Sequence, residues 1–354
     1  MNDEIRARRA ACTDTFQANG LFRPADVLPS ISADLEPDMY GDGGVVAELE
    51  SYVADLLGKP AAVFLPSGTM AQAATLRVHA DRRTSRTVVW HPYCHLAVHE
   101  SEAYARLHQL VGRAAGGPDS LLTLDDLTSV AEPVAALVLE LPQRDLGGQM
   151  PGWDALVAQT DWARGRGAAV HLDGARLWEA AAGYERSPDE IAALFDTVYV
   201  SFYKGVGALP GCCVAGPADD VAQVREWRHR LGGTLYALWP GAGSALHLLP
   251  AALAEMPARM EYTRAVARAL ADVPTVRVVP DPPQTPMMHL LLSTTADRYA
   301  AQAKRLAEES AFWVWPQAVA TGDPAVQRVE LSVGRATMRH KPSFIAETLA
   351  YLTA

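Results

Sequence analysis

The 354-residue sequence has no uninterrupted apolar stretch close to the ~20 residues that a bilayer-spanning helix needs, so we expect no membrane span. Its N-terminus lacks the apolar segment of a secretory signal. Only four cysteines occur, and they lack the spacing of a disulfide framework, which favours free thiols in a reducing compartment. We therefore expect a cytoplasmic protein.

Basic residues are also scarce. The 31 Lys and Arg residues against 41 Asp and Glu residues give a formal net charge of -10, which argues against nucleic acid or an anionic membrane as a partner. Internal repeats and low-complexity tracts are absent. The apolar fraction of 49% is enough for a sizeable core. At 354 residues, the chain is longer than most domains that have a single hydrophobic core. We expect two domains, or one large α/β domain with an appendage.

The most informative stretch of the chain lies between residues 170 and 207. Two short apolar runs in it end in reactive side chains: the first ends at Asp173, and the second, at 197–202, is followed by Lys204. Because ligands bind at the carboxyl ends of strands in open α/β sheets, we expect Asp173 and Lys204 to be neighbours. Pyridoxal phosphate chemistry needs such a pair: the amine forms a Schiff base, and the carboxylate keeps the ring nitrogen protonated. A lysine alone would more often be a solvated turn residue.

A small, hydroxyl-rich turn follows an earlier apolar run, at 61–65, and opens a helix. Its residues Ser67, Gly68 and Thr69 would present free backbone N–H groups and the positive end of the helix dipole, which suits a phosphate. Ser and Thr are also the commonest helix caps, and the two interpretations are compatible.

Three histidines, His91, His95 and His99, recur every four residues, with Glu100 beside them. A metal site is one interpretation. Pro92 leaves only His95 and His99 on one helical face, too few ligands for a firm metal site, so we expect none. A second interpretation places His95 flat on a cofactor ring, and a third leaves all three histidines at the surface.

The remaining chain suggests its domain organisation. Prolines within the first 30 residues predict an N-terminal arm (1–30) that lies on a surface. The βα rhythm predicts a large domain over 31–255, in which the loop after strand 137–141 carries Gln143 to the ligand edge. From about residue 273, short strands alternate with helices, which predicts a small α+β domain over 256–354.

Taken together, these motifs resemble the threonine aldolase and β-eliminating lyase family, and the match runs from about residue 40 to residue 243. The landmarks follow one order along the chain: Tyr40-Gly41-Asp42, Leu49-Glu50, Pro66-Ser67-Gly68-Thr69-Met70, His95-Leu96 with Glu100, Gly147-Gly148, His171-Leu172-Asp173-Gly174-Ala175-Arg176 and Lys204-Gly205. The resemblance implies an α/β aspartate-aminotransferase-like fold of type I. Such a fold has a large domain with a mainly parallel seven-stranded sheet and a small C-terminal domain.

The resemblance also implies residue roles. Lys204 would form the Schiff base with pyridoxal 5'-phosphate, Asp173 would pair with the pyridinium nitrogen, and His95 would stack on the ring. The phosphate would be held by three residues of the turn: Ser67, Gly68 and Thr69. Arg176 would lie beside the cofactor or the substrate carboxylate. Arg328, whose alternative role is a surface charge, would bind that carboxylate as a bidentate fork.

Some positions depart from the family pattern. Gln143 replaces a histidine that lies near the substrate hydroxyl, and an amide can orient a hydroxyl but cannot take its proton. The general base that takes the proton of the substrate hydroxyl would then be His95, another residue or a water. Tyr236-Ala237 replaces an Arg-Gln pair, and Tyr203 stands where a serine is usual, although Ser201 or Tyr203 could still supply a hydroxyl to the cofactor.

The leading function is cleavage of a β-hydroxy-α-amino acid to glycine and an aldehyde, or the reverse condensation. The alternatives are β-elimination, transaldolation or racemisation of another amino acid at the same cofactor, and a non-catalytic oligomeric protein. The resemblance further implies a homodimer or homotetramer with shared active sites.

Overall fold

The computed structural model describes residues 3–354, which fold into two units. The larger unit comprises Val27–Asp145 and Met150–Leu253, and the smaller unit comprises the segment up to Asp26, Leu146–Gln149 and Ala254–Ala354. The boundary between the two units lies within the long helix α12 (Trp239–Leu270). No helix within residues 3–354 combines the length and the apolar character needed to cross a membrane.

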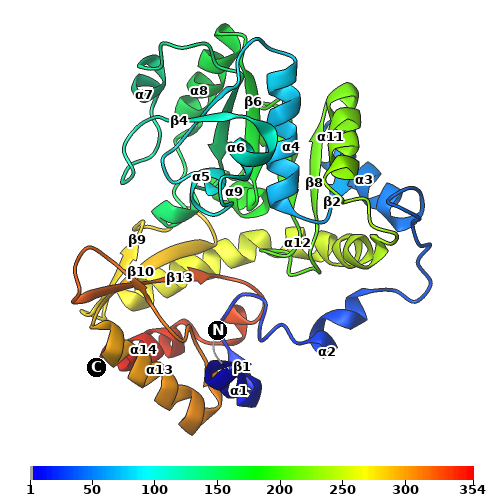
Figure 1. Ribbon diagram of the computed structural model, residues 1–354. Helices are drawn as coiled ribbons and strands as arrows, with labels where there is room; N and C mark the ends of the chain where they lie inside the picture. The colour runs from blue at the N-terminus through cyan, green and yellow to red at the C-terminus, as the bar shows by residue number, and fades with distance from the viewer. Residues whose placement is uncertain (1–2) are drawn as a thin grey trace. The chain divides into compact units, whose positions relative to one another are not determined.

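A seven-stranded sheet forms the centre of the larger unit (Figure 1), in the order β2-β8-β7-β6-β5-β3-β4. Its strands are β2 (Ala61–Leu65), β3 (Thr87–Trp90), β4 (Val111–Ala114), β5 (Ala136–Glu140), β6 (Ala169–Gly174), β7 (Thr197–Ser201) and β8 (Cys212–Gly216). Strand β8 runs antiparallel to both of its neighbours, β2 and β7, and the other strand pairs of this sheet are parallel. The predicted mainly parallel sheet is confirmed. The edge strand β4 was not predicted, because its four residues are exposed and carry no apolar run.

The larger unit contains helices α3 (Gly44–Leu56), α4 (Gly68–Asp81), α5 (His95–Val98), α6 (Ala103–His108), α7 (Leu124–Thr128), α8 (Trp153–Gly165), α9 (Leu177–Tyr184), α10 (Pro188–Ala192) and α11 (Ala218–Arg230), while α2 (Pro24–Val27) crosses the unit boundary. Helices α3, α4, α8 and α11 pack against the seven-stranded sheet, as expected for strands that are buried. Helix α3 buries an apolar stripe that includes Val46, Leu49 and Val53. The chain leaves α3 through Gly58, whose φ of 58° suits a glycine after a helix end.

The smaller unit is built on a four-stranded antiparallel sheet. The order is β12 (Val319–Ala320), β13 (Val326–Ser332), β10 (Met287–Ser293) and β9 (Val276–Val279). Helices α13 (Ala296–Ser310) and α14 (Pro342–Thr353) pack in the same unit, and α1 (Asp3–Ala11) contacts α13. The core contains Met288, Leu290, Tyr299 and Leu349, all fully buried.

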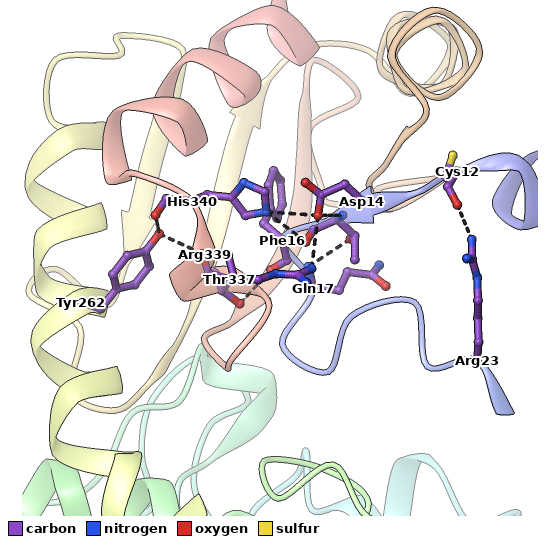
Figure 2. Close-up of polar contacts among 10 residues, drawn as sticks. Cys12, Asp14, Phe16, Gln17, Arg23, Tyr262, Thr337, Arg339 and His340 are labelled. Atoms are coloured by element: carbon purple, nitrogen blue, oxygen red, sulfur yellow. Dashed lines mark hydrogen bonds and ion pairs between the residues drawn. The ribbon is translucent and has the colours of Figure 1, made fainter. Parts of the chain in front are cut away.

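The N-terminal segment differs from the predicted surface arm. Strand β1 (Asp14–Thr15) pairs in parallel with β11 (Phe312–Trp313), and the fully buried Phe16 belongs to the core of the smaller unit. Thr337 donates a hydrogen bond of 2.8 Å to the Phe16 carbonyl, and His340 Nε2 lies 3.2 Å from the Thr15 carbonyl. Figure 2 shows Arg339 beside Asp14, to which it donates a hydrogen bond. The prediction failed because it weighed the prolines at 24 and 29 and overlooked the apolar Phe16 before them.

Candidate active site

A pocket of about 200 Å³ lies at the carboxyl ends of β2 and β7 in the larger unit. It is lined by the turn between β2 and α4, by α5 and its continuation, and by the loop after β7: Pro66, Ser67, Gly68, Thr69, Gln72, His95, Glu100, Tyr199, Tyr203, Lys204 and Pro210. Five residues predicted from the sequence therefore meet around one cavity: Ser67, Gly68, Thr69, His95 and Lys204.

The predicted acid and amine come from adjacent parallel strands. Asp173 lies in β6, in register with Tyr199 of β7, and Lys204 follows the end of β7. Burial lowers the pKa of Lys204, while the nearby negative charge of Asp173 opposes this shift. A lysine with a lowered pKa has more of the neutral amine that can attack a carbonyl. Asp173 is 1% exposed, and its carboxylate accepts hydrogen bonds from Gln72 Nε2 at 2.7 Å and Ala175 N at 3.1 Å.

The turn before α4 has the features of an anion site. Ser67 is the N-cap residue, but its side chain makes no capping hydrogen bond. The first amides of a helix have no intrahelical acceptor, so the N–H groups that follow Ser67 are available to a phosphate. Gly68 packs directly on the buried hydroxyl of Tyr199, which also hydrogen-bonds to the hydroxyl of Tyr203. A side chain at Gly68 would collide with Tyr199.

The three histidines have separate partners. His95 Nδ1 lies 2.9 Å from Oε1 of the buried Glu100, His91 Nε2 lies 2.9 Å from the Ser120 carbonyl, and His99 Nε2 lies 3.0 Å from Asp145 Oδ2. Among residues 3–354, no three His, Cys, Asp or Glu side chains are grouped to hold a metal ion. The carboxylate of Glu100 orients the His95 ring, and a proton on Nδ1 leaves Nε2 able to accept a proton.

The other predicted site residues lie as follows. Gln143 is buried and donates from Nε2 to the Tyr93 carbonyl at 3.2 Å and to Glu140 Oε2 at 3.1 Å. Ser201 is buried at the end of β7 and donates to the Ala175 carbonyl at 3.0 Å. Arg176 precedes α9, and its positive charge contributes to lowering the pKa of Lys204.

Arg328 is the one predicted site residue that belongs to the smaller unit. It lies on β13, opposite Leu291 of β10. Its proposed contact with a substrate carboxylate therefore stays a prediction.

Glu140 is a titratable residue that the sequence analysis did not single out. It ends β5 in register with Asp173 of β6, so two carboxyl groups lie side by side at the ligand edge. Desolvation and the charge of Asp173 raise the pKa of Glu140 to about 8. The position at a predicted strand end, next to Asp173, was the signal available in the sequence.

The pH dependence of stability should report this carboxyl. The folded protein holds the Glu140 proton more tightly than the unfolded chain, so stability should fall as the pH rises from about 4.5 to about 8. The free energy of unfolding should therefore fall by roughly 4 kcal/mol between about pH 5 and about pH 9, and Glu140→Gln should remove this fall. Denaturant unfolding of the cofactor-free protein at both pH values measures this difference. Glu132→Gln, at a partly exposed glutamate, is the control, and an equal response of both variants would contradict the prediction.

The architecture and the site together define a class of protein. The mainly parallel seven-stranded sheet and the solved structures that resemble this chain over nearly its whole length define the fold class of type I pyridoxal phosphate enzymes. The model of the β-eliminating lyase family matches residues 29–293, and the chain belongs to this family.

Individual relatives agree with this assignment. The chain is 35% identical to a solved protein from Listeria monocytogenes EGD-E, described as a candidate L-allo-threonine aldolase, with a TM-score of 0.91 over 99% of this chain and 98% of that one. It is 30% identical to the low-specificity L-threonine aldolase of Escherichia coli K12 over 62% of this chain and 67% of that protein. It is also 32% identical to the aldolase vrtJ of Penicillium aethiopicum over 62% of this chain, a match that spans only 58% of that relative.

Proposed function

We propose that this protein is a pyridoxal phosphate-dependent aldehyde lyase. It would cleave the Cα–Cβ bond of a β-hydroxy-α-amino acid to glycine and an aldehyde, or run the reverse condensation. The observation that carries the proposal is the convergence of Lys204, which has a lowered pKa, and the phosphate-type turn on one pocket, with the buried Asp173 on the adjacent strand. The family membership and the names of relatives at 30–35% identity support it.

The donor set fits this cofactor. When bound, pyridoxal phosphate supplies an aldehyde for the amine and a ring that accepts the electron pair released at Cα. Lys204 would bind the aldehyde carbon, and Asp173 would hold a proton on the ring nitrogen. The phosphate would be bound by the turn residues: Ser67, Gly68 and Thr69. Arg176 and Arg328 would bind the substrate carboxylate and so decide which bond at Cα is aligned for cleavage.

The phosphate assignment can be tested at Gly68. A methyl group there would press on the buried Tyr199 hydroxyl, and overpacking of this kind costs about 1–3 kcal/mol. We expect Gly68→Ala to bind pyridoxal phosphate about 10- to 100-fold more weakly, measured by absorbance titration. Gly152→Ala is the matched control, since a Cβ at Gly152 meets no atom within 4 Å. Unchanged affinity in Gly68→Ala would contradict the assignment.

We propose His95 as the base that takes the proton of the substrate hydroxyl, since the Gln143 amide cannot. Glu100 holds the His95 ring at Nδ1 and would stabilise the charge that forms on it. Glu100→Gln should lower kcat by about 10²-fold with little change in KM, because general base catalysis contributes about 10²–10⁴-fold. Glu102→Gln, in an exposed side chain nearby, should change neither constant. A change in KM alone would indicate a binding role for His95.

The reaction type can be tested with a panel of substrates. The protein is incubated with threonine, allo-threonine, phenylserine and a cysteine conjugate, and the products are identified. Glycine with an aldehyde supports the aldolase proposal. Pyruvate with ammonia would replace it with β-elimination, a reaction at the same cofactor that the substitution of Gln143 for histidine favours. A protein whose absorbance no amino acid perturbs would be a non-catalytic member of the family.

A further inference from the structure

A row of buried polar side chains begins at Asp173 and Gln72, beside the pocket, and continues into the core of the larger unit. Its members are Gln72, His171, Thr197 and His79, and each is at most 2% exposed. Buried polar groups destabilise a protein unless they are hydrogen-bonded. Four such side chains that lie next to one another in the core therefore require an explanation. None of the four is a residue that the proposed reaction uses directly.

The fold places these residues in contact through simple periodicities. Gln72 and His79 lie about two helical turns apart on α4, so they share one face. His171 lies two residues before Asp173 on β6 and therefore points to the same side of the sheet. Thr197 of β7 is in register with His171. The face of α4 that packs on β6 and β7 therefore supplies Gln72 and His79, and the two strands supply His171 and Thr197.

Four hydrogen bonds connect the row. Gln72 Nε2 lies 2.7 Å from Asp173 Oδ2, and Gln72 Oε1 lies 3.2 Å from His171 Nε2. His171 Nδ1 lies 2.8 Å from Thr197 Oγ1, which lies 2.8 Å from His79 Nε2. Each of the three interior residues thus contacts the next one on either side.

The direction of every bond follows from the first one. An ionised carboxylate only accepts, so Gln72 must turn its NH₂ group to Asp173 and its oxygen to His171. His171 must then carry its proton on Nε2. Burial lowers the pKa of His171 and of His79 to about 3 each, so both rings are neutral and His171 Nδ1 accepts. Thr197 therefore donates to His171 and accepts from His79 Nε2–H.

We propose that Gln72, His171, Thr197 and His79 form a directed hydrogen-bond chain that positions the carboxylate of Asp173. This rests on the proposed function only in giving Asp173 its task at the cofactor ring. Each link removes one alternative arrangement: His171 prevents rotation of the Gln72 amide, Thr197 selects the His171 tautomer, and His79 fixes the Thr197 hydroxyl. These are positioning residues, since each acts through its neighbour.

The hydrogen-bond chain can be tested in the protein without cofactor. Long-range ¹H–¹⁵N NMR of protein labelled at histidine reports tautomers, and His79→Asn and His171→Asn assign the two signals. We expect both rings to be neutral with the proton on Nε2 between about pH 6 and about pH 8. A charged His171, or a proton on its Nδ1, would overturn the proposal. This outcome does not depend on whether the protein binds pyridoxal phosphate.

Two substitutions at Thr197 separate positioning from packing. Thr197→Val keeps the volume and removes the hydroxyl, whereas Thr197→Ser keeps the hydroxyl and removes a methyl group. If the hydrogen-bond chain positions Asp173, the Thr197→Val protein should bind pyridoxal phosphate about tenfold more weakly. The pH midpoint of the visible absorbance of the bound cofactor should also shift by about half a unit or more. Thr197→Ser should resemble the unaltered protein in both measurements.

The control is Thr160→Val, a fully buried threonine of α8 whose hydroxyl donates to the Val157 carbonyl. It should leave cofactor affinity and absorbance unchanged. The proposal is overturned if Thr197→Ser is the more affected variant, since packing would then explain the residue, or if Thr197→Val leaves the His171 tautomer and the cofactor measurements unchanged. A protein that binds no cofactor, yet shows the expected tautomers and their loss in Thr197→Val, would refute the proposed function alone.

Discussion

Lys204→Ala is expected to abolish the borohydride-reducible attachment of pyridoxal phosphate and to lower lyase activity by about 10³-fold or more, as removal of a nucleophile does. The pocket around Lys204 offers no second lysine, and the burial that lowers the pKa of its amine favours attack on the aldehyde. The measurement is the visible absorbance of the protein with cofactor, before and after borohydride, followed by peptide mapping.

Lys59→Ala provides a demanding control for this experiment. Burial lowers the pKa of Lys59 too, and its Nζ donates to the Phe195 carbonyl at 2.6 Å, outside the pocket. If a lowered lysine pKa were sufficient for attachment, Lys59 would also carry the pyridoxyl group. Attachment at Lys59, or full activity of Lys204→Ala, would refute the site assignment.

Asp173→Asn is expected to have the second-largest effect. Loss of an opposite charge next to a protonated group lowers its pKa by about 1–3 units, so the cofactor ring would lose most of its proton near neutral pH and activity would fall about 10- to 1000-fold. The amide would also be able to turn its own NH₂ group toward Gln72, where the carboxylate accepts a hydrogen bond now. Steady-state kinetics and the absorbance of bound cofactor measure both consequences.

Asp145→Asn is the matched control, because Asp145 lies near the same sheet edge but pairs with His99 and does not line the pocket. We expect its kinetics to stay within about threefold of those of the unaltered protein, as for most partly exposed ion pairs. An Asp173→Asn protein that behaves like this control would show that the ring nitrogen needs no carboxylate in this chain.

Much of the fold could be predicted because buried parallel strands are nearly continuous apolar runs. β6 and β7 are buried at every residue, and both were located within a residue or two. Strand β4 escaped prediction because all four of its residues are exposed at the sheet edge. Phe16 was missed for a related reason: one apolar residue among prolines and charges has no period, and only its pairing partner β11, far along the chain, buries it.

The sequence by itself determined the family, several of the buried strands of the large sheet, and the placement of Lys204 near Asp173, because residues that end adjacent parallel strands must share one edge. Only the tertiary structure decided what surrounds that pair. Glu140 beside Asp173 depends on strand register, Tyr199 behind Gly68 depends on how α4 approaches β7, and the chain from Gln72 to His79 depends on which face of α4 packs on the sheet. Such contacts join side chains about a hundred residues apart, and local periodicity carries no information about them.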